Sequence, residues 1–213
     1  MTLLKICGVT RPEDASMVSR YADYVGVIVA SRVKTPRLVD EAKAIEIVSE
    51  VKGAKPVMVV DGLALGKAVE LAGRLGFSVI QYYGELTLNE GLEKALNDAG
   101  VKLAPALTYI GDDSIVSRAI ELAGLDYVEY VLIDAPKVGY RTFEAGLKIP
   151  LSLVSRVSGV VKVGVAGGIN PGNVSLVAKY RPYLIDVSSG VESRPGVKDE
   201  GLVRAIARVV KGG

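Results

Sequence analysis

The sequence predicts an α/β protein that forms a single domain over residues 1–213, a closed barrel of eight βα units (a TIM barrel). Three observations predict this fold. Short runs rich in Val and Ile alternate with amphipathic segments along the whole chain. The starts of successive runs are roughly 20–30 residues apart, which is close to the length of one βα unit. The composition does not change between the two halves, so nothing indicates a linker or a second domain.

The apolar runs predict eight strands. Each run is apolar at successive positions, which is typical of strands in a parallel sheet that is buried on both faces. The predicted strands cover residues 3–7, 24–29, 56–60, 78–81, 101–107, 130–134, 160–166 and 184–187.

The segments between these runs predict eight helices, because their apolar residues recur at helical spacing. The predicted helices cover residues 12–21, 40–51, 64–72, 88–99, 114–122, 151–157, 171–179 and 200–210. A glycine follows several of them, where a left-handed residue commonly ends a helix. These glycines are Gly53, Gly73, Gly100, Gly124 and Gly159.

Eight such units are compatible with a closed barrel or with an open, doubly wound sheet. No Gly-x-Gly-x-x-Gly motif follows a predicted strand, so there is no sign of the dinucleotide site of the open fold. The segment from Gly62 to Ala68 resembles a phosphate loop, but its glycine spacing is one residue short and it lacks the final Ser or Thr. Eight units in 213 residues therefore favour the barrel.

The composition excludes several kinds of chemistry. The chain has no His and a single Cys, so it cannot form a Ser-His-Asp triad, a histidine-ligated zinc site or an internal disulfide. We expect no metal and no cofactor. Carboxylates, Lys, Tyr and Cys7 remain for proton transfer.

Charge and hydropathy patterning limit the partners. A formal net charge of +2 without a basic run gives no indication of nucleic-acid binding. No signal peptide and no apolar stretch of about 18 residues is apparent, so we expect no membrane span and a cytoplasmic protein. The chain contains one Gln, four Asn and many charged residues, which predicts a thermophilic source. The oligomeric state stays open between monomer and homodimer.

Glycines and serines gather at the ends of the last two predicted strands. Gly167 and Gly168 follow the seventh strand, and Ser188, Ser189 and Gly190 follow the eighth. Loops after strands seven and eight form the recurrent phosphate site of this barrel, with backbone N–H groups as donors. Each of these two groups alone is more often a turn, but the two groups on neighbouring strands together predict phosphate binding.

Four further side chains lie at predicted strand ends or in the second loop. Cys7 is either a packed thiol or a reactive one. Asp134 and Asp186 each end or follow an apolar run, where a carboxylate must be paired, hydrated or protonated. Arg37 is either an anchor for an anionic substrate or a solvated charge in a loop.

Taken together, these segments resemble the phosphoribosylanthranilate isomerase family of tryptophan biosynthesis. The resemblance spans the whole chain. The segments that carry it are Lys5-Ile-Cys-Gly-Val-Thr10 with Asp14, the pair Pro36-Arg37, Val79-Ile-Gln81 before Gly84, Leu132-Ile-Asp134, Gly167-Gly-Ile-Asn-Pro-Gly-Asn-Val174 and Asp186-Val-Ser-Ser-Gly-Val-Glu192. Where the family commonly has a His after the glutamine, this chain has Tyr83.

The resemblance implies an Amadori rearrangement of a phosphosugar, N-(5-phosphoribosyl)anthranilate. Cys7 matches the general base at ribose C2, and Asp134 matches the general acid at the ring oxygen. Arg37, Gln81 and Asp186 match substrate-binding positions. Gly168, Ser189 and Gly190 match the family's phosphate-binding positions, and Gly167 and Ser188 complete the phosphate site that the strand ends predict.

Two alternative functions stay open at this point. One is another phosphosugar isomerase or epimerase on the same barrel, although the paired carboxylates or histidine ligands of those enzymes are missing from the corresponding strands. The other is a non-catalytic barrel that only binds a phosphosugar.

Overall fold

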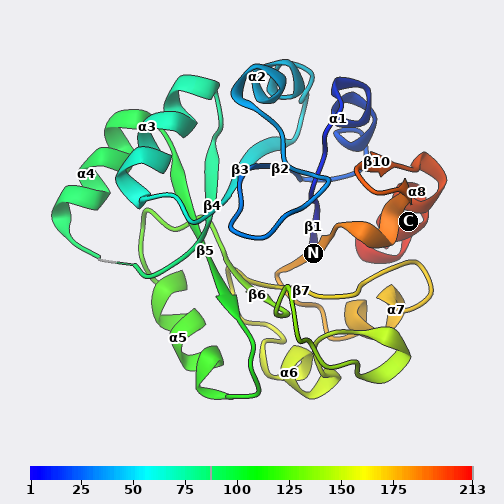
Figure 1. The fold of residues 1–213 in the computed structure, drawn as a ribbon. Coiled ribbons are helices and arrows are strands. Elements are labelled where there is room, and N and C mark those ends of the chain that lie inside the picture. The colour runs from blue at the N-terminus through cyan, green and yellow to red at the C-terminus, as the bar shows by residue number, and fades with distance from the viewer. Residues whose placement is uncertain (87, 213) are drawn as a thin grey trace.

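The computed structural model describes residues 1–86 and 88–212, and its eight long strands form one closed parallel barrel. Neighbouring strands pair in chain order, and β8 closes the barrel against β1 with Lys5 opposite Asp186. The strands are β1 (Leu3–Ile6), β2 (Tyr24–Ala30), β3 (Lys55–Asp61), β4 (Val79–Tyr83), β5 (Lys102–Thr108), β6 (Val131–Asp134), β7 (Val163–Ala166) and β8 (Leu184–Val187). Figure 1 shows these strands at the centre of the molecule. The predicted barrel is confirmed, and the open sheet is excluded.

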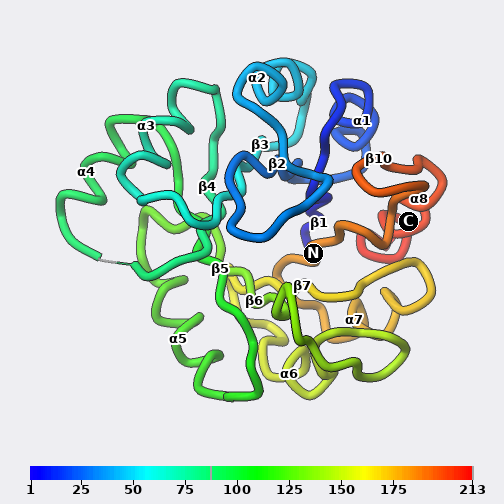
Figure 2. Tube along the Cα trace, viewed as in Figure 1, coloured from blue at the N-terminus to red at the C-terminus, as the bar shows by residue number. Residues whose placement is uncertain are grey.

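The helices form a ring outside the strands, and α8 lies beside α1 where the chain closes on itself (Figure 2). They are α1 (Pro12–Val18), α2 (Glu41–Ser49), α3 (Leu65–Leu75), α4 (Glu90–Ala99), α5 (Ser114–Ala123), α6 (Leu151–Arg156), α7 (Val174–Ala178) and α8 (Glu200–Lys211). The residues that precede α2, α4 and α8 are Asp40, Asn89 and Asp199, and each caps its helix by accepting a hydrogen bond from a backbone N–H of the first turn. Among the described helices, none is long and apolar enough to cross a membrane.

Alternation along the strands divides the apolar residues into two cores. Leu4 and Ile6 of β1 point outward, into the large core between strands and helices. The other set points inward and fills the barrel, with Tyr24, Val57, Leu132 and Leu184 among its members. Lys5 belongs by position to this inner set, so a charged side chain lies inside the barrel.

Several element limits differ from the prediction. β4 extends to Tyr83, two residues beyond the predicted end, which places Tyr83 on the inner side with Val79 and Gln81. β7 begins at Val163 rather than at residue 160, after Lys162 in a left-handed conformation. Residue 213, the last of the predicted single domain, lies outside the described residues.

Two of the five predicted helix-ending glycines differ from the prediction, Gly73 in its position and Gly124 only in its conformation. Gly73 lies inside α3, and Gly76 takes the left-handed end position instead. A Cβ on Gly73 would lie 3.4 Å from Ala99 Cβ, so glycine permits close packing of α3 against α4 at this point. Gly124 ends α5 with φ −74°, in a right-handed conformation that any residue can adopt.

A short excursion after β8 returns charged residues to the barrel mouth. The 3-10 helix η2 (Ser189–Val191) leads into a hairpin of β9 (Glu192–Arg194) and β10 (Val197–Lys198). Glu192 and Lys198 stand opposite each other in this hairpin, close to the carboxyl end of β8. A second 3-10 helix, η1 (Glu144–Gly146), lies in the loop after β6.

Candidate active site

A cavity of about 340 Å³ opens at the carboxyl ends of the strands, where this kind of barrel carries its chemistry. Eight of the ten predicted site residues line it, and these are Cys7, Arg37, Asp134, Gly167, Gly168, Asp186, Ser188 and Ser189. Gln81 and Gly190 are not part of the lining. Gln81 is buried behind Tyr83, and Gly190 packs between the last two loops.

Cys7 lies above a buried ion pair at the closure of the barrel. Lys5 Nζ and Asp186 Oδ2 are 3.0 Å apart, and both side chains are withdrawn from solvent. A Cβ placed on Gly26 of β2 would lie 2.9 Å from Cys7 Sγ and 2.9 Å from Lys5 Nζ. The thiol and the ammonium therefore share the space beside Gly26, which only a glycine leaves open.

Burial and nearby charges act in opposite directions on this cluster. Burial raises the pKa of the Cys7 thiol, and the carboxylate of Asp186 adds to that rise, whereas the ammonium groups of Lys5 and Lys198 oppose it. Burial alone would lower the pKa of Lys5, but Asp186 and Cys7 outweigh it and the pKa is raised. Lys5 is therefore a permanent cation beside a thiol that is mostly protonated near neutral pH.

Asp134 lines the same cavity as Cys7 and lies at the end of β6. Its Oδ1 accepts a hydrogen bond from the backbone N–H of Ala135 at 2.8 Å, and its Oδ2 accepts one from the hydroxyl of Tyr83 at 2.8 Å. Burial raises the pKa of Asp134, assisted by Asp186, while Tyr83, Ala135 and Lys5 act against the rise. A carboxyl group with a raised pKa can serve as a proton donor nearer to neutral pH.

Two more side chains lie behind Tyr83. Gln81 Nε2 donates to the Tyr83 hydroxyl oxygen at 3.2 Å, and the Tyr130 hydroxyl donates to Gln81 Oε1 at 3.1 Å. Tyr130 and Gln81 are almost completely buried in the barrel. The sequence therefore places a continuous line of polar side chains, from inside the barrel to Asp134, where the inner core is otherwise mostly apolar.

Arg37 is held by the excursion that follows β8. Its Nε and Nη2 atoms donate to the two carboxylate oxygens of Glu192 at 2.8 and 2.6 Å, the two-pronged geometry of a strong arginine–carboxylate pair. Lys198 Nζ donates to Glu192 Oε1 at 2.8 Å and to the Ser188 carbonyl at 3.1 Å. Although burial acts against it, these two cations hold the pKa of Glu192 below its usual range.

The glycine and serine loops form one wall of the cavity. Gly167 and Gly168 have φ values of 125° and 73°, which side chains rarely tolerate. A Cβ on Gly168 would lie 2.7 Å from the carbonyl oxygen of Gly146, and one on Gly190 would overlap the carbonyl oxygen of Ile169. Glycine at these positions therefore lets the loops after β6, β7 and β8 pack together and present backbone groups to the cavity.

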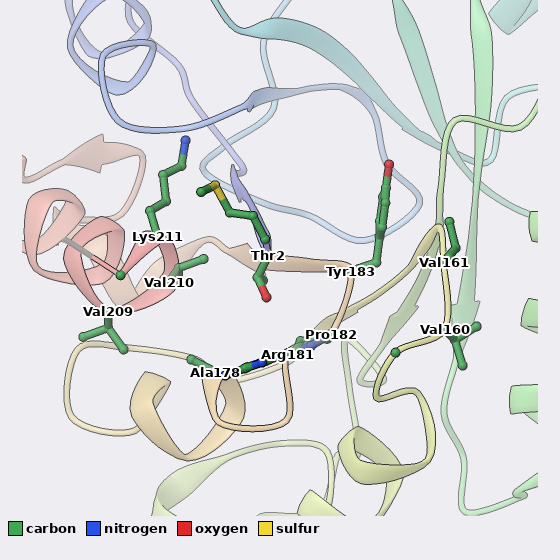
Figure 3. Close-up of a pocket in the computed structure, with 13 residues that line it drawn as sticks. Thr2, Val160, Val161, Ala178, Arg181, Pro182, Tyr183, Val209, Val210 and Lys211 are labelled. Carbon is green, nitrogen blue, oxygen red and sulfur yellow. The ribbon is translucent and has the colours of Figure 1, made fainter.

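Two other cavities lie outside this site. One of about 480 Å³ lies at the opposite end of the barrel, between segments that precede the strands and α8. Figure 3 shows Thr2 between Val210 of α8 and Tyr183 in this view. Among the residues that the structure describes, its lining includes no Asp or Glu and none of the predicted site residues. The other, of about 260 Å³, adjoins the active-site cavity through Tyr83, Pro136 and Lys137.

The sequence did not identify several residues of the site. Lys5 and Tyr83 lie inside the barrel, as the predicted Gln81 does, because alternate residues of a strand face the same side, a signal that the period of two in β1 and β4 contains. Lys148 lines the cavity beside Gly168, and no pattern in the sequence pointed to it. Within residues 1–86 and 88–212, no three Cys, Asp or Glu side chains form a group that could hold a metal ion.

Comparison with known proteins assigns a family. A family model described as N-(5'phosphoribosyl)anthranilate (PRA) isomerase matches residues 4–209. N-(5'-phosphoribosyl)anthranilate isomerase from Pyrobaculum islandicum is 42% identical over 208 residues, which covers 98% of this chain and 97% of the relative. The isomerase from Pyrobaculum aerophilum is 39% identical, with 99% of both chains covered.

Solved structures agree with this result. The isomerase from Pyrococcus furiosus is 27% identical, with a TM-score of 0.78 and full coverage of both chains. A phosphoribosyl anthranilate isomerase in complex with reduced 1-(o-carboxyphenylamino)-1-deoxyribulose 5-phosphate is 25% identical, with a TM-score of 0.77. The isomerase from Thermotoga maritima, described as dimeric and studied as monomers, has the same TM-score and 27% identity.

Proposed function

Since the chain belongs to the N-(5'-phosphoribosyl)anthranilate isomerase family, we propose that Cys7 and Asp134 are the base and the acid of its reaction. The enzyme isomerises N-(5-phospho-β-D-ribosyl)anthranilate to 1-(2-carboxyphenylamino)-1-deoxy-D-ribulose 5-phosphate in tryptophan biosynthesis. The observation that carries the proposal is the placement of Cys7 and Asp134 on one cavity, directly after β1 and at the end of β6, with the glycine and serine loops as a third wall.

The reaction needs an acid that protonates the ring oxygen and a base that removes a proton from C2. Asp134 gives its proton to the ring oxygen while the C1–O bond breaks and the nitrogen lone pair forms a C=N bond to C1. Cys7, as thiolate, then takes the proton from C2, and the electrons of that C–H bond form the C1=C2 bond and neutralise the nitrogen. The resulting enol tautomerises to the ketone when C1 gains a proton and the C2 hydroxyl loses one. An acid and a base on separate strands suit this sequence because they approach the sugar from different sides.

The electrostatics support these two roles. A free Asp has a pKa of about 3.9, too low for a proton donor near neutral pH, so the raised pKa of Asp134 favours the acid form. A thiolate is the reactive form of Cys, and Lys5 and Lys198 favour it against the effect of burial. The site therefore raises the pKa of its acid and restrains the rise in the pKa of its base.

The remaining site residues fit the two ends and the middle of the substrate. Gly167, Gly168, Ser188 and Ser189 suit the phosphate, because open backbone amides and hydroxyl groups are good donors to an anion. Gly190 lies outside the lining and lets the loops after β7 and β8 pack together. Arg37 suits the carboxylate of the anthranilate ring, since its pairing with Glu192 uses Nε and Nη2 and leaves Nη1 for substrate. In the described part of the chain Asp186 Oδ1 is buried without a hydrogen-bond partner, which suits a ribose hydroxyl as donor.

Activity measurements on single-atom variants test the assignment. We expect Cys7→Ser and Asp134→Asn each to lower kcat by about 10²- to 10⁴-fold, the usual contribution of a positioned acid or base. The assay follows the fluorescence of the anthranilate derivative as it is consumed. Thermal midpoints within a few degrees of wild type would show that both variants fold. Rates near wild type in both variants would overturn the assignment of acid and base.

Location in the cytoplasm stays a prediction. Fractionation of source cells, with immunodetection of this protein in the membrane and soluble fractions, would test it.

A further inference from the structure

We propose that Tyr83 is a positioning residue for the general acid, and that it acts as a fixed hydrogen-bond donor to Asp134 at the end of the line Tyr130–Gln81–Tyr83–Asp134. The inference rests on the proposed role of Asp134. It assigns a task to a tyrosine at the position where, by the resemblance described above, a His is common.

The hydrogen bonds along this line have a direction. The Tyr130 hydroxyl donates to Gln81 Oε1, which orients the amide so that its Nε2 group points to Tyr83. An amide nitrogen can only donate, so the Tyr83 oxygen accepts from it. The phenolic hydrogen of Tyr83 is then directed to its other neighbour, Asp134 Oδ2, at 2.8 Å.

Both oxygens of the acid are thereby held. The Ala135 N–H donates to Oδ1 and the Tyr83 O–H donates to Oδ2, so the plane of the carboxyl group is set by two elements, β4 and the start of the loop after β6. A carboxyl group with a fixed plane presents its proton to the substrate in one orientation, which lowers the entropic part of the barrier.

The Tyr83 bond also strengthens as the reaction proceeds. Asp134 becomes a carboxylate while it gives up its proton, and a donor that is already aimed at Oδ2 stabilises the developing charge. The same bond favours the carboxylate in the free enzyme and so opposes the rise in the pKa of Asp134 that burial causes. Tyr83 therefore limits that rise.

Other charged groups face this pair and do not replace the phenol. Asp186 from β8 raises the pKa of Asp134, and Lys5 from β1 lowers it. Burial, and after it the charges of Asp134, Cys7 and Asp186, hold the pKa of Tyr83 well above its ordinary value. Lys137, from the loop after β6, packs its ammonium over the Tyr83 ring, 4.2 Å from the centroid. Tyr83 consequently stays a neutral donor throughout the working pH range, whereas an imidazole would change its charge there.

The variant Tyr83→Phe tests the inference, because it removes one hydroxyl and keeps the ring. We expect kcat to fall about 10- to 100-fold, the value of a hydrogen bond to a charged group. Without this donor the carboxylate form loses support, so the kinetic inflection that reports Asp134 should move up by about one to two pH units. A ¹³C NMR titration of the Asp134 carboxyl group in the unliganded enzyme should show the same upward shift.

Tyr82→Phe is the matched control, since Tyr82 is the next residue of β4 and points outward into the core between strands and helices. It should leave the pH profile unchanged.

Gln81→Met and Tyr130→Phe remove the groups that orient Tyr83 and should give smaller shifts in the same direction as Tyr83→Phe. An unchanged NMR titration of Asp134 in Tyr83→Phe would overturn the inference. A near-normal rate in Asp134→Asn would instead overturn the role of Asp134 as general acid. The NMR titration would then still show whether Tyr83 donates a hydrogen bond to the Asp134 carboxyl group.

Discussion

Lys5 affects both the folding stability of this protein and the chemistry of its proposed base. Its side chain is completely buried, and its ammonium pairs with Asp186 at 3.0 Å while it faces Cys7. A buried ion pair is weak evidence for stability, because desolvation offsets most of the attraction. The benefit of this pair is a fixed cation beside the proposed base, where the thiolate form needs support.

Replacing Lys5 by Met should therefore change two measurements. The unfolding free energy should fall by about 3–5 kcal/mol, since Asp186 is left as an unpaired buried charge. The kinetic inflection that reports Cys7 should move to higher pH, because the largest opposing influence on the raised thiol pKa is removed. Urea unfolding and the pH dependence of kcat/KM measure the two effects, and Lys67→Met at an exposed position of α3 is the control. A thiol inflection that does not move would contradict the role of Lys5.

The pH dependence of stability follows from the sign of the Lys5 shift. The folded-state pKa of Lys5 is raised above its ordinary value of 10.5. The contribution of the pair is thus complete below that value and is lost as the pH rises through the folded-state pKa. Lys5→Met should remove this alkaline loss of stability, which unfolding measurements above pH 10 would detect.

At the scale of elements, the close approach of β2 to β1 leaves the space in which Cys7 and Lys5 lie side by side. Gly26 of β2 has no side chain, and the space in front of it holds Cys7 Sγ and Lys5 Nζ. The end of β4 is equally important, because two further residues of regular strand direct Tyr83 inward. Strand geometry thus places the donor to the proposed acid, and the proposed base follows β1 directly, with its N–H donating to the Val187 carbonyl of β8.

Gly26→Ala should be harmful and Gly66→Ala harmless. The added Cβ at position 26 would lie 2.9 Å from Cys7 Sγ and from Lys5 Nζ. We therefore expect overpacking to lower the unfolding free energy by about 1–3 kcal/mol and kcat to fall. At position 66, in α3, nothing lies within 4 Å of the added Cβ, and Ala should stabilise the helix by up to about 1 kcal/mol. Thermal unfolding and the fluorescence assay compare the two variants. Equal effects at the two positions would contradict the close approach in the barrel.

At the scale of the whole molecule, the composition and the surface ion pairs both favour the predicted thermophilic source. Exposed pairs within helices, such as Lys94–Asp98 and Arg118–Glu121, accompany the low content of Asn and Gln. Ion pairs gain in value as temperature rises, since the cost of desolvating charges falls.

We expect the protein to melt well above about 65 °C, the upper end of the common mesophilic range. Differential scanning calorimetry at neutral pH measures the midpoint. A midpoint near about 50 °C would contradict a thermophilic source.

Much of this protein was predictable from local sequence. Eight apolar runs in alternation with amphipathic segments specify the barrel, because each run buries both faces of a strand and each amphipathic segment covers it. The rule that parallel strands carry function at their carboxyl ends then selected Cys7, Asp134, Asp186 and the glycine and serine loops. Eight of the ten selected residues line one cavity.

Only the tertiary structure decided how these residues interact. Lys5 meets Asp186 across 181 positions of the chain, Arg37 meets Glu192 across 155, and Tyr83 meets Asp134 across 51. The sequence determined which residue types stand at which strand ends, because periodicity is a local property of the chain. Which donor faces which acceptor depends on barrel closure and strand register, and these are set by packing between segments that are distant in sequence.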